Sequence, residues 1–320
     1  MGGGGFIGNH LVSHLISLGH EVIAADIKYP EFSPTKASYF HKVDLRSLDA
    51  VKKALEGCDQ LYQLAADMGG AGYIFTGSND INIMHNSSQI NLNVIKVAKE
   101  SKNLNRILYT SSACIYPDHI QKDPKCSALK EDFAYPAAPD SEYGWEKLYS
   151  ERLYLTLFKN AGIETRIARL HNIFGPLGTW VGGKEKAPAA LSRKVAESEK
   201  SIDVWGTGNQ TRSFLYIDEC IEGLTRLMES DFRWPLNIGS EERISIKDLA
   251  KLIIGISGKD LAINFVEGPT GVEGRSSDNE LIETALNWSP SCTLKSGLEK
   301  TYPWISEQVM AFKAKQSKVK

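Results

Sequence analysis

Tyr143 and Lys147 stand four positions apart, a spacing that places both on one face of a helix. A lysine ammonium beside a phenol stabilises the phenolate, so a tyrosine with a free pKa of about 10 could act as a base near neutral pH. Such a pair suits oxidation and reduction of an alcohol, although the same spacing also arises by chance on exposed helices. Ser112 lies 31 residues before Tyr143, at the end of a predicted strand, and could hydrogen-bond the same substrate oxygen. That context favours a catalytic pair.

Cys114 adds a second kind of chemistry to this group. Oxidation of an alcohol gives a ketone, which acidifies the hydrogens on the neighbouring carbons. A thiol at such a site can move a proton on carbon, so the combination predicts epimerisation rather than simple dehydrogenation. The alternative is an inert core cysteine, which is the commonest fate of a free thiol.

The chain begins with a glycine-rich turn in which Gly2, Gly5 and Gly8 are spaced three apart. Phe6 and Ile7 open an amphipathic helix within it. Glycines at this spacing let a backbone turn approach a pyrophosphate, which then sits on the helix N-terminus. Consecutive glycines alone could also form a flexible chain end. The amphipathic helix that follows them is what favours a pyrophosphate-binding turn.

Asp26 follows Gly8 by 18 residues, at the end of a predicted strand. A carboxylate there would accept hydrogen bonds from the adenosine ribose and repel a 2′-phosphate, so NAD is favoured over NADP. The competing interpretation is a cap at the strand end.

Short apolar runs alternate with amphipathic helical patterns, which is typical of a parallel sheet with crossover helices. We expect helices over 7–18, 47–55, 81–99 and 143–158, strands over 21–25, 60–65, 106–110 and 164–170, and a glycine-rich substrate loop over 67–80. After Asn172 the pattern is less regular, with short strands near 202–205 and 213–217 and helices near 218–228 and 245–256.

These patterns predict an α/β fold with a Rossmann-type doubly wound parallel sheet and a smaller mixed α/β substrate domain. The first domain would span 1–171 and about 214–240, and the second about 172–213 and 241–320. The glycine loop of such a fold normally follows a central strand, whereas here it starts at Gly2. We therefore expect the first strand to be truncated, which would expose backbone groups of its neighbours.

The bulk composition bounds the class of protein. The chain has 320 residues, 37 basic and 39 acidic side chains and a net charge of −2, so no global field favours nucleic acid. Its five cysteines form no C-x-x-C pair, which argues against a zinc site or a disulfide framework. A reducing cytoplasm fits best. No run of about 18 apolar residues and no signal peptide are present, so we expect no membrane association.

Several motifs together carry a resemblance to a known family. They are Ala65–Gly70, Ser111–Pro117, Tyr143–Lys147, His171–Asn172, Gly182–Ala190 and Gln210–Phe214. With the glycine-rich start, the chain resembles the extended short-chain dehydrogenase/reductase family of nucleotide-sugar enzymes, and within it the GDP-mannose 3,5-epimerases. The resemblance runs from Gly2 to about Gln308.

The resemblance implies an NAD-dependent conversion of GDP-D-mannose to GDP-L-galactose, with some GDP-L-gulose. Tyr143 would act as base towards the sugar C4 hydroxyl, and Lys147 would support it and bind the nicotinamide ribose. Cys114 and Lys186 would be the acid–base pair for C3 and C5, with the assignment of acid and base left open. Lys186 alone could equally be a solvated surface residue.

The resemblance also assigns further binding residues. Those for NAD are Gly2, Gly5, Phe6, Ile7, Gly8, Asp26, Asp44, Leu45, Ala65, Tyr143 and Lys147. Those for the sugar nucleotide are Gly69, Ser112, Ala113, Cys114, Asn172, Glu185, Lys186, Ala187, Lys194, Gln210, Thr211, Arg212 and Arg275. Asp44 could equally be the N-cap of the next helix. Arg275 is the stronger phosphate candidate, because arginine gives bidentate geometry.

Members of the family form homodimers through a four-helix contact, so we expect the helices near 81–99 and 141–158 to pair across a dimer.

Related activities remain as alternatives. A nucleotide-sugar 4,6-dehydratase would carry Thr-Asp-Glu where this chain has Ser112-Ala113-Cys114, so both carboxylates of its acid–base pair are missing. Another NDP-hexose 4-epimerase stays open, as does a non-catalytic sugar-nucleotide-binding protein disabled by the missing strand. The nucleotide base and the exact sugar also stay open.

Overall fold

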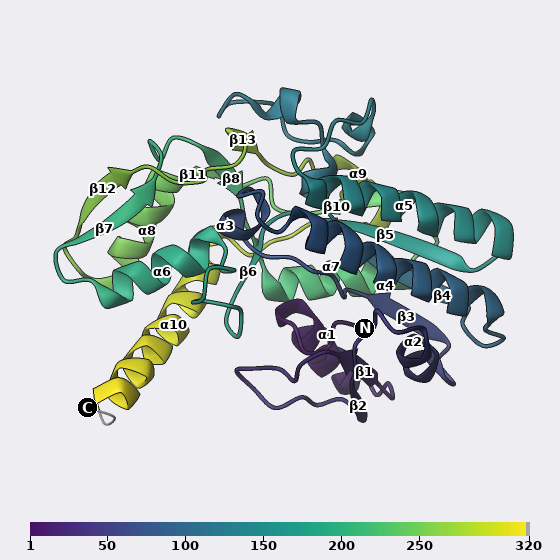
Figure 1. Ribbon diagram of the computed structural model, residues 1–320. Helices are drawn as coiled ribbons and strands as arrows, with labels where there is room; N and C mark the ends of the chain where they lie inside the picture. The colour runs from purple at the N-terminus through teal and green to yellow at the C-terminus, as the bar shows by residue number, and fades with distance from the viewer. Residues whose placement is uncertain (318–320) are drawn as a thin grey trace.

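The computed structural model describes residues 1–317 of the chain. Figure 1 shows a sheet of parallel strands flanked by helices on one side of the molecule and a smaller mixed lobe around β7 and β12 on the other. The predicted α/β fold with a Rossmann-type sheet is confirmed. The assignment of the two domains to particular segments stays a prediction, and residues 318–320 of the second segment lie outside the described residues.

Four parallel strands form the central sheet, in the order β10–β5–β4–β3. Their bounds are Gln60–Gln63 (β3), Arg106–Ser112 (β4), Glu164–Leu170 (β5) and Pro235–Ile238 (β10). A second parallel pair consists of β1 (Ile23–Asp26) and β2 (Tyr39–Lys42). Strand β4 is buried along nearly its whole length, as expected for a parallel strand covered on both faces.

Met1 and Gly2 lie between the two groups of strands. The Met1 amino group donates to the carbonyl of Tyr62 at 2.9 Å, and Leu64 N–H donates back to the Met1 carbonyl at 3.2 Å. On the other side, Gly2 N–H donates to the Ala25 carbonyl at 2.8 Å. The backbone of Met1 and Gly2 thus connects the end of β1 with β3 through hydrogen bonds.

Helices cover both faces of the sheet. One face packs against α2 (Leu48–Leu55), α4 (Asp80–Glu100) and α5 (Glu142–Ala161), and the other against α1 (Phe6–Ser17) and α7 (Ile217–Glu229). Successive residues of a strand point to opposite faces of the sheet. In β4, Ile107 and Tyr109 therefore pack in the core with α2, α4 and α5, whereas Leu108 packs in the core with α1 and α7. Figure 1 shows α4 and α5 running side by side.

The smaller lobe is built from short elements. Its helices are α6 (Ala187–Glu197), α8 (Ile246–Ser257) and α10 (Leu294–Ser317), with α9 (Glu280–Leu286) beside β10. Strands β7 (Ser201–Trp205) and β12 (Ala262–Val266) pair in parallel. Strands β11 (Arg243–Ser245), β8 (Thr211–Ser213) and β13 (Gly274–Arg275) form a small mixed sheet. Strands β6 (Ile173–Phe174) and β9 (Leu215–Tyr216) link the lobes.

The sequence-based elements agree with the structure to within a few residues up to Leu170. The loop expected over 67–80 contains a short helix, α3 (Ala71–Ile74). The strand expected over 213–217 is wrong as one piece: β8 ends at Ser213 and β9 covers only Leu215–Tyr216. Elements that the sequence pattern did not predict include β2, β10, α6 and α10.

Candidate active site

Strand β4 delivers the first functional residues. It ends at Ser112, and a 3-10 helix over Ala113–Ile115 follows. The Ser112 hydroxyl accepts a hydrogen bond from the Cys114 backbone N–H at 3.2 Å, which caps this short helix. The Cys114 side chain is only 8% exposed. Helix α5 approaches closely because Gly144 has no side chain; a Cβ there would lie 2.1 Å from the Cys114 carbonyl oxygen.

Helix α5 carries Tyr143 and Lys147 one turn apart, near its N-terminus. Ser141 is the N-cap, and its hydroxyl accepts from Gly144 N–H at 3.2 Å. The Lys147 ammonium donates to the Thr110 carbonyl at 2.9 Å and lies 5.7 Å from the centre of the Tyr143 ring. The structure thus confirms that both side chains share one face of a helix.

The electrostatics of Tyr143 differ from the sequence-based expectation. Burial raises the pKa of the phenol, and a hydrogen bond with Ser112 only partly offsets this effect. Burial also lowers the pKa of Lys147, whose ammonium is held by Thr110. In the protein without ligands, desolvation of the phenolate is thus the main influence on Tyr143, and its role as a base stays a prediction.

Cys114 lies within a buried ion cluster. Arg275 donates from Nη1 to the Cys114 sulfur at 3.2 Å, from Nε to Gln121 at 2.6 Å, and from Nη2 to Asp140. Burial and the Asp140 carboxylate raise the pKa of the thiol, while the Arg275 guanidinium lowers it. The proton on Cys114 is thus controlled by residues from two distant parts of the chain.

Lys186 enters the same cavity from the other lobe. It immediately precedes α6 and follows a loop in which Gly182 and Gly183 have positive φ angles of 100° and 86°, a backbone region that favours glycine. Gly70 N–H donates to the Lys184 carbonyl at 3.0 Å, which ties this loop to α3. Burial lowers the pKa of the Lys186 ammonium, which suits it to proton exchange.

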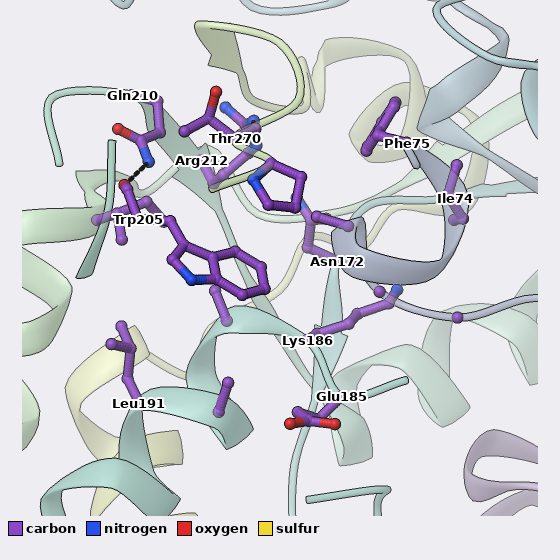
Figure 2. A pocket seen from close by; sticks show the side chains of 18 of the residues that line it. Ile74, Phe75, Asn172, Glu185, Lys186, Leu191, Trp205, Gln210, Arg212 and Thr270 are labelled. Carbon is purple, nitrogen blue, oxygen red and sulfur yellow. Dashed lines mark hydrogen bonds between the residues drawn. The ribbon is translucent and has the colours of Figure 1, made fainter. Parts of the chain in front are cut away.

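One cavity brings together nearly all of the predicted substrate residues (Figure 2). Those that line it are Gly69, Ser112, Ala113, Cys114, Asn172, Glu185, Lys186, Ala187, Lys194, Gln210, Arg212 and Arg275, and the catalytic candidate Tyr143 lines it as well. Thr211 differs: its hydroxyl donates to the Pro124 carbonyl, and it is not among the residues that line the cavity. Successive side chains along a strand point to opposite faces, so Thr211 points away from the cavity that Gln210 and Arg212 line.

Arg212 is better placed than Arg275 to bind an anionic ligand, because its guanidinium has no carboxylate partner among residues 1–317. It donates instead to the carbonyls of Thr211, Thr270 and Val272. Burial and the nearby Arg275 lower its pKa to about 10, so it still carries a charge at neutral pH. Arg275 is paired with Asp140, which makes it a weaker phosphate candidate in this structure than the sequence suggested.

The glycine-rich turn is shaped to receive a dinucleotide. A Cβ at Gly8 would lie 2.0 Å from the Gly2 carbonyl, so this close turn requires glycine. A Cβ at Gly5 would meet only one atom, at 3.4 Å, which leaves open space above the N-terminus of α1. Asp26 accepts hydrogen bonds from the backbone N–H groups of Gly4 and Lys28 at 3.0 and 3.1 Å. This geometry fits the pyrophosphate and ribose of NAD.

The remaining cofactor candidates lie around this turn. Ala65 N–H donates to Gln63 Oε1 at 3.3 Å, and a Cβ on Gly2 would lie 2.8 Å from the Ala65 nitrogen. Leu45 is buried. The alternative role of Asp44 as N-cap is wrong, because Ser47 occupies that position of α2. The Asp44 carboxylate pairs with Arg46, and its contact with adenine stays a prediction.

Sequence reasoning missed Asp140 and Gln121, which hold Arg275. Their separations from Arg275 are 135 and 154 residues, so no local pattern reveals the contacts. Asp140 does precede the N-cap Ser141 of the Tyr143 helix, which is a weak signal that it lies near the site.

The chain is similar to known enzymes over most of its length. A family model described as the NAD dependent epimerase/dehydratase family matches residues 1–239. The chain belongs to this family. It is 48% identical over 320 residues to a GDP-mannose 3,5-epimerase of Arabidopsis thaliana, covering 99% of this chain and 84% of that protein. It is also 48% identical over 310 residues to GDP-mannose 3,5-epimerase 1 of Oryza sativa subsp. japonica, covering 96% and 81%.

A solved structure of a more distant relative agrees with the fold. The UDP-glucuronic acid 4-epimerase of Bacillus cereus, in complex with UDP-glucuronic acid and NAD, matches with a TM-score of 0.82 and 28% identity. The match covers 96% of this chain and 98% of that chain. The resemblance inferred from the motifs is thus confirmed at the level of the family.

Residues 1–317 contain neither a membrane-spanning helix nor a metal-binding cluster of acidic, histidine or cysteine side chains. None of the helices there has the length and apolarity needed to cross a membrane. No group of three or more His, Cys, Asp or Glu side chains in that range is placed to hold a metal ion.

Proposed function

We propose that this protein epimerises GDP-D-mannose at C3 and C5 to give GDP-L-galactose, with some GDP-L-gulose, through transient oxidation at C4. The observation that carries the proposal is the meeting of Cys114 and Lys186 with Ser112 and Tyr143 in one cavity. The 48% identity to GDP-mannose 3,5-epimerases supports the choice of substrate.

The side chains divide the reaction between them. Tyr143 takes the proton of the C4 hydroxyl, and Ser112 hydrogen-bonds the same oxygen. NAD, held by the glycine-rich turn and Asp26, would supply the reversible oxidation at C4. The C4 ketone acidifies the hydrogens at C3 and C5, so Cys114 and Lys186 exchange protons there, one removing and the other returning a proton to invert each carbon. No net oxidation results.

The charges of the cavity support a nucleotide diphosphate. Arg212 supplies a buried guanidinium without a carboxylate partner in the described chain, and Lys194 also lines the cavity. Arginine recognises phosphate oxygens through parallel hydrogen bonds. A diphosphate beside Arg212 would neutralise a charge that the protein alone leaves uncompensated.

We also propose that the chain acts as a cytoplasmic homodimer. Helices α4 and α5 pack side by side and expose the large apolar side chains of Ile81, Leu92, Trp145 and Tyr149. Such a patch favours association, and the five free thiols fit a reducing compartment.

Sedimentation should show a dimer that Leu92→Asp converts to a monomer. Met310→Asp, on the exposed surface of α10, should leave the dimer intact. A monomeric wild type would contradict the dimer.

The direct test is analysis of products after incubation of GDP-mannose with the purified protein and NAD. A 3,5-epimerase gives galacto- and gulo-configured sugars, which NMR distinguishes. A plain 4-epimerase inverts C4 alone, and a non-catalytic binding protein gives no product. Either of these last two results, with protein shown to be folded, would overturn the proposed activity.

A further inference from the structure

Two loops from different lobes meet beside the catalytic residues. One leads into α3 and carries Gly70, and the other carries Lys184 and ends at Lys186, immediately before α6. Gly70 N–H donates to the Lys184 carbonyl at 3.0 Å, and a Cβ on Gly70 would lie 2.3 Å from the Glu185 carbonyl oxygen. Backbones this close require glycine at position 70. Figure 2 shows Lys186 extending from its loop toward the segment that carries Ile74.

Three side chains reinforce this backbone contact. The Lys184 ammonium lies 3.8 Å from the centre of the Tyr73 ring and 3.6 Å from Asp67 Oδ1. The Tyr73 hydroxyl donates to the same Asp67 oxygen at 2.8 Å. Burial and this hydrogen bond raise the pKa of Tyr73 to about 12, so the phenol keeps the proton that it donates at neutral pH. The aromatic face and the carboxylate together favour one position of the Lys184 side chain.

Asp67 is itself fixed to the first lobe. Its Oδ2 accepts from the Asn86 side chain of α4 at 2.9 Å, and its backbone N–H donates to Ser87 Oγ at 3.0 Å. We call Asp67, Tyr73 and Lys184 the latch. None of these three side chains is among the residues that line the cavity, so the latch lies outside the space that a substrate would fill.

We propose that the latch positions Lys186 for proton exchange, an assignment that rests on the proposed function. Lys186 lies two residues after Lys184, in a loop where Gly182 and Gly183 have positive φ angles. Glycines give a loop many accessible conformations, so the local sequence does not fix the place of the Lys186 ammonium. The latch closes this loop against the lobe that carries Cys114, and so holds the acid–base pair across one cavity.

The first test removes the charge of Lys184 and leaves the cavity lining as it is. Lys184→Met should lower kcat for GDP-mannose by on the order of 10-fold with KM nearly unchanged, because a misplaced catalytic group loses rate steeply. Lys184→Arg keeps a cation over the Tyr73 ring and should retain most of the activity. Lys251→Met, which breaks an exposed ion pair with Asp248 on α8, should keep the wild-type kcat. A wild-type kcat in Lys184→Met would overturn the inference.

The second test asks whether Tyr73 and Lys184 act together. Tyr73→Leu should lower kcat about as much as Lys184→Met, because each substitution breaks the same contact. The double variant should then lose little more than either single variant. Losses that add in full would show two independent effects and overturn the inference.

Hydrogen exchange provides a readout that needs no substrate. Backbone amides of residues 182–186 should exchange faster in Lys184→Met than in wild type or Lys251→Met, because local opening controls exchange. An unchanged rate in Lys184→Met would overturn the inference even if kcat falls. A folded wild type that does not turn over GDP-mannose would instead contradict the proposed function, and the exchange rates would still decide whether the latch holds the loop.

Discussion

At the scale of single residues, the site depends on how burial and charge oppose each other. Cys114 and Tyr143 are both buried, and burial raises the pKa of each. Spacing in the sequence singled out Tyr143 and Lys147 as candidates, and its residue type singled out Cys114, which lines one cavity with Tyr143. It could not reveal Asp140 or Gln121, because a hydrogen bond between side chains more than 130 residues apart leaves no local pattern.

Removal of the Arg275 guanidinium should make the Cys114 thiol harder to ionise. The guanidinium stabilises the thiolate, so Arg275→Gln should raise the thiol pKa further. We expect alkylation of Cys114 by iodoacetamide, followed by mass spectrometry of its peptide, to require a higher pH than in wild type. Arg226→Gln, in an exposed ion pair on α7, is the control. An unchanged or lower pH midpoint in Arg275→Gln would contradict this reading of the cluster.

At the scale of elements, close packing between α5 and the turn after β4 sets the geometry of the site. The sequence predicted β5 at its observed bounds, Glu164–Leu170. It missed β10, whose four residues acquire their strand pairing only from contact with β5. It also missed α6, whose start depends on Pro188 near its N-terminus and on a loop shaped by Gly182 and Gly183.

A methyl group at position 144 should separate these elements. A Cβ there would lie 2.1 Å from the Cys114 carbonyl, so Gly144→Ala must shift α5 or the turn. We expect a loss of about 1–3 kcal/mol in the free energy of unfolding by urea, together with a large loss of turnover. Gly255→Ala in α8 meets no atom within 4 Å and should instead stabilise by about 0.5–1 kcal/mol. Equal effects of the two substitutions would refute this account of the packing.

At the scale of the whole molecule, both lobes contribute to the cavity and a buried polar network lies near it. His171, at the end of β5, contacts Asn237 Oδ1 at 2.9 Å, and Tyr116 donates to that same oxygen at 2.6 Å. Burial is the main cause that lowers the His171 pKa from 6.5 to about 3, although its bond to Asn237 opposes this shift. The fold was predictable from alternating strands and helices, whereas such a network needs the three-dimensional arrangement.

The neutral His171 should make the protein sensitive to acid. Below pH 6.5 the unfolded chain protonates this histidine and the folded protein does not, so stability falls as the pH drops towards about 3. The loss should approach about 1.4 kcal/mol per pH unit for this one proton. Urea unfolding at pH 7.5 and 5 should show a smaller pH dependence for His171→Gln than for wild type. His20→Gln, at an exposed position, should not change it; an equal slope in His171→Gln would refute the prediction.

The central claim is that Cys114 takes part in proton exchange at the sugar carbons beside a transient C4 ketone. The most direct measurement is NMR of GDP-mannose incubated in D2O with NAD and either wild type or Cys114→Ala. The account predicts deuterium at both C3 and C5 with wild type, and at neither carbon with a folded Cys114→Ala that still binds NAD. Full exchange in Cys114→Ala, or no exchange in folded wild type, would contradict it.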